Sequence, residues 1–216
     1  MTHWSLNEIE ATSKRAARGA GRSWGMAEEA GKAVRSLHET GLPGVKLLAA
    51  LLHETDNLAE TTLAPTRLTG VWQAGNNSLC PIATGATLCD IAAEIAAGRE
   101  VTTGPVTWPL LVLPFARALA GMGATAIRLR WADVSVDALR DGVLLNSDFD
   151  ALFAARAESL TCRRIETCAR ASAVQPLHNV AADDWERLNA FAFRTFAPES
   201  EASRRKGAGS SLPDND

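Results

Sequence analysis

The stretch Arg18-Gly19-Ala20-Gly21-Arg22-Ser23-Trp24-Gly25 separates two strongly amphipathic segments near the start of the chain. Glycine commonly ends helices because it adopts positive φ without strain, and serine begins them because its hydroxyl accepts an amide hydrogen bond. The unpaired amides and the dipole at such a helix start attract an anion. Gly19, Gly21, Arg22 and Ser23 are therefore candidate ligand-binding residues. A tight interhelical turn with Arg22 in solvent is the alternative.

Three amphipathic helices are expected around this turn. Ser5 and Glu8 have the spacing of a capping box, in which the hydroxyl and the carboxylate each accept an amide of the first turn. The expected helices run from Ser5 to Gly19 or Gly21, from Ser23 to Gly41, and onward from Pro43. Their inward residues are mostly small, and the third helix carries a stripe of leucines. The three helices should therefore pack closely as an N-terminal bundle.

The pattern changes after Pro65. Residues 66–73 are expected to form a strand, and a helix that ends at Gly98 follows. Thr87 and Asp90 match the capping pattern for the start of that helix. Further along, a helix that starts at Trp108-Pro109 and a buried strand at 110–113 followed by a helix from Pro114 are both consistent with residues 104–121.

The second half of the chain contains the strand signals. Residues 124–131 give the clearest one, because apolar residues alternate there with Arg128 and Arg130. Further strand candidates are 134–136, 143–145 and 160–165. Capping patterns for two later helices occur at Ser147 with Asp150 and at Asp183 with Glu186. Helices first and a mixed half afterwards predict an α+β fold with a mixed or antiparallel sheet.

We expect one compact domain over residues 1–198. Residues 199–216 are polar and rich in glycine and serine, which is typical of a disordered tail. Their Lys206-Gly207-Ala208-Gly209 segment repeats the character of the first glycine-rich stretch. We therefore predict that this tail is at least partly ordered and folded back on the domain.

Composition excludes several classes of function. The formal charge of −3 over 216 residues argues against nucleic-acid binding, which normally needs a basic surface. The first residues lack the apolar core of a signal peptide, and the longest apolar run, 108–120, is too short and too interrupted to cross a bilayer. Four cysteines without a Cys-x-x-Cys pair are expected to be free thiols in a reducing cytosol. These features are typical of a cytoplasmic protein of bacterial type.

Candidate catalytic groups are few. Cys80 precedes a helix start, where a thiolate is stabilised, although cysteine is more often a core residue. Asp90 is a second candidate, with helix capping as the alternative. His53 is a third, with solvated surface as the alternative. The histidines and cysteines show no metal-ligand spacing, and the sequence gives no indication of a cofactor.

The motifs also resemble a known family. The opening ones are Ser5-Leu6-Asn7-Glu8-Ile9-Glu10, Ala17-Arg18-Gly19-Ala20-Gly21 and Trp24-Gly25-x-Ala27-Glu28-Glu29-Ala30-Gly31. The later ones are Cys80-Pro81 with Gly85, Pro109-Leu110-Leu111-x-Leu113-Pro114-Phe115, and the ending Ser203-Arg204 … Gly207-Ala208-Gly209 … Asp214-Asn215-Asp216. This pattern resembles the bacterial domain-of-unknown-function family 3726 over nearly the whole chain. The resemblance implies no reaction.

Two functional hypotheses follow. The first is an enzyme that acts on a small anionic metabolite, a carboxylate, held by the glycine-rich turn with Arg204 or Arg205 as a second clamp. The second is a non-catalytic ligand-binding protein or an accessory subunit of a metabolic enzyme. A closed pocket that joins residues 19–25, 80–90 and the tail favours the first, and a filled core favours the second. Neither membrane nor nucleic acid is an expected partner, and assembly into a homo-oligomer is left open.

Overall fold

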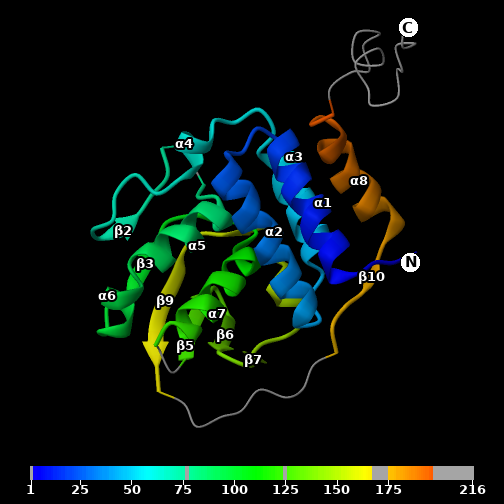
Figure 1. The fold of residues 1–216 in the computed structure, drawn as a ribbon. Coiled ribbons are helices and arrows are strands. Elements are labelled where there is room, and N and C mark those ends of the chain that lie inside the picture. The colour runs from blue at the N-terminus through cyan, green and yellow to red at the C-terminus, as the bar shows by residue number, and fades with distance from the viewer. Residues whose placement is uncertain (1, 76–77, 124–125, 167–174, 197–216) are drawn as a thin grey trace, which may run out of the picture.

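The computed structural model describes residues 2–75, 78–123, 126–166 and 175–196. It confirms the α+β class, with helices first and a mixed sheet after them. Three layers follow one another (Figure 1). The helical bundle forms the first layer, the helices over Pro81–Asp90 and Leu113–Gly121 form the middle layer, and the sheet forms the third.

The bundle begins as the sequence predicts. Its first three helices are α1 (Leu6–Gly19), α2 (Trp24–Glu39) and α3 (Gly44–Glu54). The capping box is formed, because Glu8 N donates to Ser5 Oγ at 3.2 Å and Ser5 N donates to Glu8 Oε2 at 2.9 Å. Ser23 caps α2, and Gly41 turns the chain at φ 75° after it.

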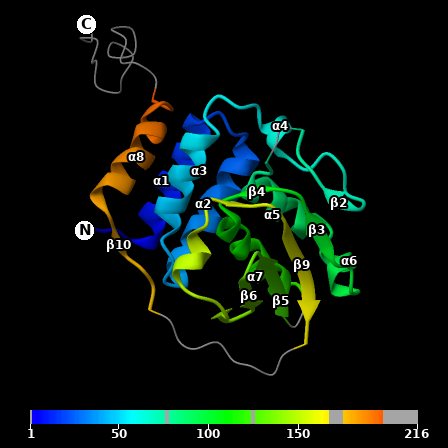
Figure 2. The ribbon, with the colours of Figure 1, turned by 180° about the vertical axis from the view of Figure 1, so that it is seen from behind.

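A fourth helix completes the bundle from the far end of the sequence. Helix α8 (Ala182–Phe193) packs against α1 and α3 (Figures 1 and 2). Trp185 of α8 stacks on Trp4 with ring centroids 4.1 Å apart. The predicted cap by Asp183 and Glu186 is wrong, because the helix starts at Ala182 and its N-cap residue, Ala181, has no side-chain acceptor.

A two-stranded pair joins the start of the described chain to the segment just before α8. Strand β1 (Thr2–His3) pairs antiparallel with β10 (Asn179–Val180). The rings of His3 and His178 stack across this pair, with centroids 4.9 Å apart. The histidine pair is thus formed by residues that are far apart in sequence.

The segment between bundle and sheet differs from expectation. Its elements are α4 (Glu60–Leu63), β2 (Val71–Trp72), α5 (Pro81–Asp90) and α6 (Ala92–Ala96). The strand expected over 66–73 is reduced to β2. The predicted cap by Thr87 and Asp90 is wrong: Thr87 Oγ1 donates back to Ala83 O at 2.8 Å, and Asp90 is the last residue of α5. Proline at the first helical position moves the start of α5 to residue 81.

The ambiguous run over 104–121 folds as helix after two short strands. The elements are β3 (Val101–Thr103), β4 (Val106–Thr107), the 3-10 helix η1 (Pro109–Val112) and α7 (Leu113–Gly121). Trp108 turns the chain with φ 47° and ψ 61°, and Pro114 lies in the first turn of α7, where its missing N–H costs nothing. The helical interpretation is correct, with a break between the two helices.

Six strands make the main sheet, in the order β2-β3-β9-β5-β6-β7. Its remaining members are β5 (Ala126–Trp131), β6 (Val134–Leu139), β7 (Gly142–Leu145) and β9 (Leu160–Ile165). Strands β2 and β3 are parallel and the other neighbours are antiparallel, so the sheet is mixed. A separate pair joins β4 to β8 (Arg156–Ala157), and the 3-10 helix η2 (Asp150–Phe153) precedes β8.

The core lies between sheet and bundle. Helix α7 packs on β5 and β6 on one side and on α2 and α5 on the other. The Ser147–Asp150 cap is not formed, because Ser147 Oγ accepts the Ser135 amide at 2.7 Å and the N-cap of η2 is Phe149. None of the helices in the described ranges combines the length and the hydropathy that a bilayer crossing requires.

Candidate functional site

The glycine-rich turn uses its glycines for helix termination and helix packing. Gly21 has φ 83°, its N–H donates to Arg18 O at 2.9 Å, and the Arg22 N–H donates to Ala17 O at 3.0 Å. This is the Schellman pattern, in which the amides of Gly21 and Arg22 are both hydrogen-bonded within the turn. A Cβ added at Gly19 would lie 1.8 Å from the carbonyl oxygen of Phe191, so glycine there admits α8. Neither glycine offers a free amide to an external anion.

The start of α2 holds an anion that belongs to the protein itself. The Ser23 N–H and hydroxyl donate to the two carboxylate oxygens of Glu60, at 2.8 and 2.9 Å. The Ser23 hydroxyl also accepts the Met26 amide at 3.3 Å. The attraction of a helix start for negative charge is therefore satisfied by the first residue of α4. The sequence gives no signal for this contact, because 37 residues separate Glu60 from Ser23.

Arg22 is buried, with only 6% of its surface exposed. Its Nη2 donates to Thr55 O at 2.9 Å and to Thr55 Oγ1 at 2.6 Å, and its Nη1 donates to Leu58 O at 3.1 Å. Thr55 is the C-cap residue of α3, so the guanidinium lies at the negative end of that helix. The prediction of a solvated Arg22 is wrong.

The charge of Arg22 has only neutral hydrogen-bond partners. Within the described ranges, no carboxylate forms an ion pair with it. Carbonyl and hydroxyl oxygens together with the α3 dipole offset part of the cost of burying a cation, and a carboxylate would offset more. Arg22 is therefore a buried cation without a direct ion-pair partner among the described residues. The pKa of Asp56 is lowered by its hydrogen bond with Arg194 and, less strongly, by the charge of Arg22.

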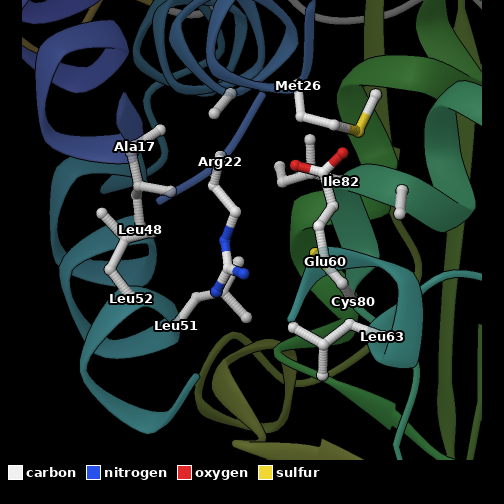
Figure 3. A pocket seen from close by; sticks show the side chains of 12 residues that line it. Ala17, Arg22, Met26, Leu48, Leu51, Leu52, Glu60, Leu63, Cys80 and Ile82 are labelled. Carbon is white, nitrogen blue, oxygen red and sulfur yellow. The ribbon is translucent and has the colours of Figure 1, made fainter. Parts of the chain in front are cut away.

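A small cavity lies beside Arg22 (Figure 3). Its volume is about 20 Å³, which is room for about one water molecule. Apolar side chains from α1, α2, α3, α4 and α5 form most of its wall, including Met26, Leu52 and Leu63. Arg22, Glu60 and Cys80 are its polar members. The cavity thus joins the glycine-rich stretch to the start of α5 on a small scale, and the tail, the third part of the expected pocket, lies outside the described residues.

Cys80 is the N-cap residue of α5 and is 8% exposed. Burial raises the pKa of its thiol, and the amides of Ala83 and Ile82 together with the charge of Arg22 act in the opposite direction. Burial outweighs them, so the sulfur is a protonated thiol at neutral pH. Burial also raises the pKa of the other two described thiols, to about 11 for Cys89 and to about 12 for Cys162.

The other predicted catalytic residues lie outside the cavity. His53 is exposed on α3, and Asp90 is exposed at the C-terminal end of α5. Asp90 lies nine positions after Pro81 in α5, which corresponds to a rise of about 13 Å along the helix axis. Neither side chain lines the cavity that contains Cys80. Arg204 and Arg205 lie outside the described residues. In the described part of the chain, no cluster of three His, Cys, Asp or Glu residues could hold a metal ion.

These features define an α+β protein with a small apolar cavity beside a buried arginine at a junction of helices. Residues 4–80 match the family model described as "Protein of unknown function (DUF3726)", which confirms the predicted resemblance for its opening motifs, whereas the motifs after residue 80 lie outside the match. The matched residues contain every member of the cavity wall except Ile82 and Ala83. No curated protein matches the chain.

Proposed function

We propose that the protein binds a short aliphatic carboxylate in the cavity beside Arg22, without catalysing its conversion. One observation carries the proposal: a buried guanidinium with only neutral partners faces a cavity whose remaining wall is mostly apolar. A carboxylate would supply the missing negative charge, and a short alkyl chain would fit the leucine and methionine side chains.

The size of the cavity limits the ligand and implies a movement. A volume of about 20 Å³ is too small for a carboxylate with its alkyl chain, so a segment that lines the cavity must move outward when the ligand binds. Helix α4 is the candidate, because it has four residues and only Leu63 among them is buried. Segments with few buried apolar contacts open at low free-energy cost. Ligand entry would move α4 and with it Glu60, whose negative charge disfavours an acid nearby.

The non-catalytic alternative has the better support. A nucleophilic thiol needs a lowered pKa or an adjacent base, whereas burial raises the pKa of Cys80. His53 and Asp90, the two predicted acid–base candidates, are exposed elsewhere. Binding in the service of a neighbouring enzyme needs only the charge of Arg22 and the apolar wall of the cavity, and it requires no proton transfer.

Titration calorimetry with acetate, propionate and butyrate tests this proposal. Propanol and propylamine serve as probes of similar size without the negative charge. We expect the acids to bind with dissociation constants of about 1 mM or lower, since ligands of four to six heavy atoms reach about 4 kcal/mol. The alcohol and the amine should not bind. Equal binding of propionate and propanol would exclude Arg22 as the recognition element.

Substitution of a wall residue separates binding from folding. Ala83→Val adds two methyl-sized groups to the cavity and leaves Arg22 untouched, so acid binding should fall by about tenfold or more. Ala93→Val is the matched control, because it makes the same change at an exposed position of helix α6. If both variants bind propionate like the unchanged protein, the cavity is not the binding site.

Cytoplasmic location belongs to the same proposal. The described cysteines Cys80, Cys89 and Cys162 are free thiols, which supports a reducing compartment. Fractionation of producing cells tests it.

A further inference from the structure

The face of the sheet opposite α7 carries a row of arginines. Along β5, Ile127, Leu129 and Trp131 are buried, whereas Arg128 and Arg130 point to the other face. In the antiparallel pair with β9, Arg128 is opposite Arg163 and Arg130 is opposite Thr161. Directly opposed residues share one face of a sheet, and diagonal neighbours are about 7–8 Å apart. Three guanidinium groups therefore lie close together.

Only one of the three has an acidic partner. Arg128 donates to both carboxylate oxygens of Asp137, at 2.6 and 2.7 Å, and Asp137 is 3% exposed. The side chains of Arg130 and Arg163 are exposed and form neither a hydrogen bond nor an ion pair with any described residue. Arg163 is directly opposite the like-charged Arg128, which is a destabilising arrangement, and Arg130 is its diagonal neighbour. Arg128 is structural, and the other two are available.

A depression of about 320 Å³ lies between these two arginines. Its wall includes the side chains of Thr161, Ser159 and Glu100. Ala132, at the β5–β6 turn, also lines it and has φ 44°, a conformation that is uncommon for a residue other than glycine. The two-residue turn between the paired residues Trp131 and Val134 accounts for this value, because such turns have positive φ at a central residue. The depression is about as large as a site for a small ligand.

We propose that this depression binds a small organic phosphate that also carries hydroxyl groups. Two guanidinium groups match the charge of a phosphate, which is between −1.5 and −2 near neutral pH, and they grip its oxygens in pairs. Glu100 has no ion-pair partner in the described part of the chain, and it would accept a hydrogen bond from a ligand hydroxyl. Glu100 thus selects a hydroxylated phosphate over bare phosphate. The site is separate from the cavity beside Arg22, so either proposal can fail alone.

Calorimetry with inorganic phosphate and glycerol 3-phosphate at low ionic strength tests the site. We expect both to bind at millimolar concentration or below, and glycerol 3-phosphate more tightly. Arg130→Gln and Arg163→Gln should each weaken binding about tenfold or more, because each removes one charge-assisted contact. Glu100→Gln should reduce the preference for glycerol 3-phosphate over phosphate.

The matched control is Arg187→Gln, since the Arg187 side chain is 71% exposed on α8, away from the sheet. This variant should bind like the unchanged protein. Three outcomes would overturn the proposal: neither phosphate binds, the Arg130 and Arg163 variants bind as tightly as the control, or a single-stranded oligonucleotide binds through these arginines while glycerol 3-phosphate does not.

Discussion

The side chain of Arg22 has a structural task in addition to the proposed one. Its three hydrogen bonds join the α1–α2 turn to the end of α3. Hydrogen bonds to charged groups contribute about 1.5–3 kcal/mol each, and their removal would leave buried carbonyl groups unpaired. Replacement of Arg22 would therefore disturb folding and binding together. For this reason a substitution at Ala83, which only fills space, is the more informative test of the cavity.

His38 is the residue that should make folding sensitive to acid. It is 1% exposed, its Nε2 accepts the Val45 amide at 3.2 Å, and its Nδ1 therefore carries the proton and donates to Leu177 O at 2.5 Å. Burial lowers the pKa of His38, and the charge of His178 lowers it further, whereas the contact with Leu177 acts against this. The neutral imidazole is thus built into the junction of α2, α3 and the segment before β10.

The sign of the pH effect follows from this lowered pKa. An unfolded histidine titrates near pH 6.5, so below that pH the unfolded chain binds more protons than the folded one. The stability that neutral His38 provides is complete above about pH 6.5 and falls as the pH drops toward the folded pKa, by at most about 1.4 kcal/mol per pH unit. Urea denaturation at several pH values between about 7.5 and 5, the range in which histidine titrates, measures this loss of stability. His38→Gln should flatten this slope, and exposed His53→Gln should not; an unchanged slope in His38→Gln contradicts the assignment.

Helix packing at this site depends on glycine for close approach. At Gly19 of α1 a Cβ would lie 1.8 Å from the backbone oxygen of Phe191, and backbone cannot rotate away as a side chain can. Gly25 of α2 is also helical, but nothing lies within 4 Å of a Cβ added there. The two positions form a matched pair for one substitution.

The expected effects of alanine have opposite signs at the two positions. Gly19→Ala should lower the free energy of unfolding by about 1–3 kcal/mol or more, since overpacking exceeds the gain of about 1 kcal/mol in helix propensity. Gly25→Ala should raise it by up to about 1 kcal/mol. Urea denaturation of both variants decides the matter. If both substitutions raise the free energy of unfolding, α8 does not pack closely against α1 at Gly19.

Elements with a local cause could be predicted from the sequence, and long-range contacts could not. The capping box at Ser5 and the apolar periodicity of α1 to α3 act within a few residues, so the helices were predictable. The alternation around Arg128 likewise predicted β5. Helix α8 reaches α1 from the other end of the chain, and no pattern in either helix specifies that partner. The site shows the same limit, because Arg22 was found from its motif while Glu60 and Thr55 were not.

At the scale of the whole molecule, the end of α8 lies close to the α1–α2 turn, which contains the cavity residue Arg22. Arg194, just after α8, forms a bidentate ion pair with Asp56 at 2.7 and 3.0 Å. A Cβ added at Gly19 would also lie 3.3 Å from the Cβ of Arg194, so Arg194 is close to that helix end. The described chain ends at residue 196, three residues after the last residue of α8. Residues 199–216 lie outside the described residues, and the last described residues follow the contact of α8 with Gly19.

This placement gives the predicted tail a specific test. A tail that made no contacts would be removable without effect, because nothing would offset its ordering entropy. We predict instead that a chain ending at residue 198 keeps its urea midpoint but binds propionate more weakly, since Arg204 and Arg205 would add positive charge beside the cavity. Limited proteolysis with trypsin is the second measurement: propionate should slow cleavage after Arg204, Arg205 and Lys206. Equal propionate binding by the full and the shortened chain, with cleavage unaffected by ligand, would mean that residues 1–198 hold the complete site.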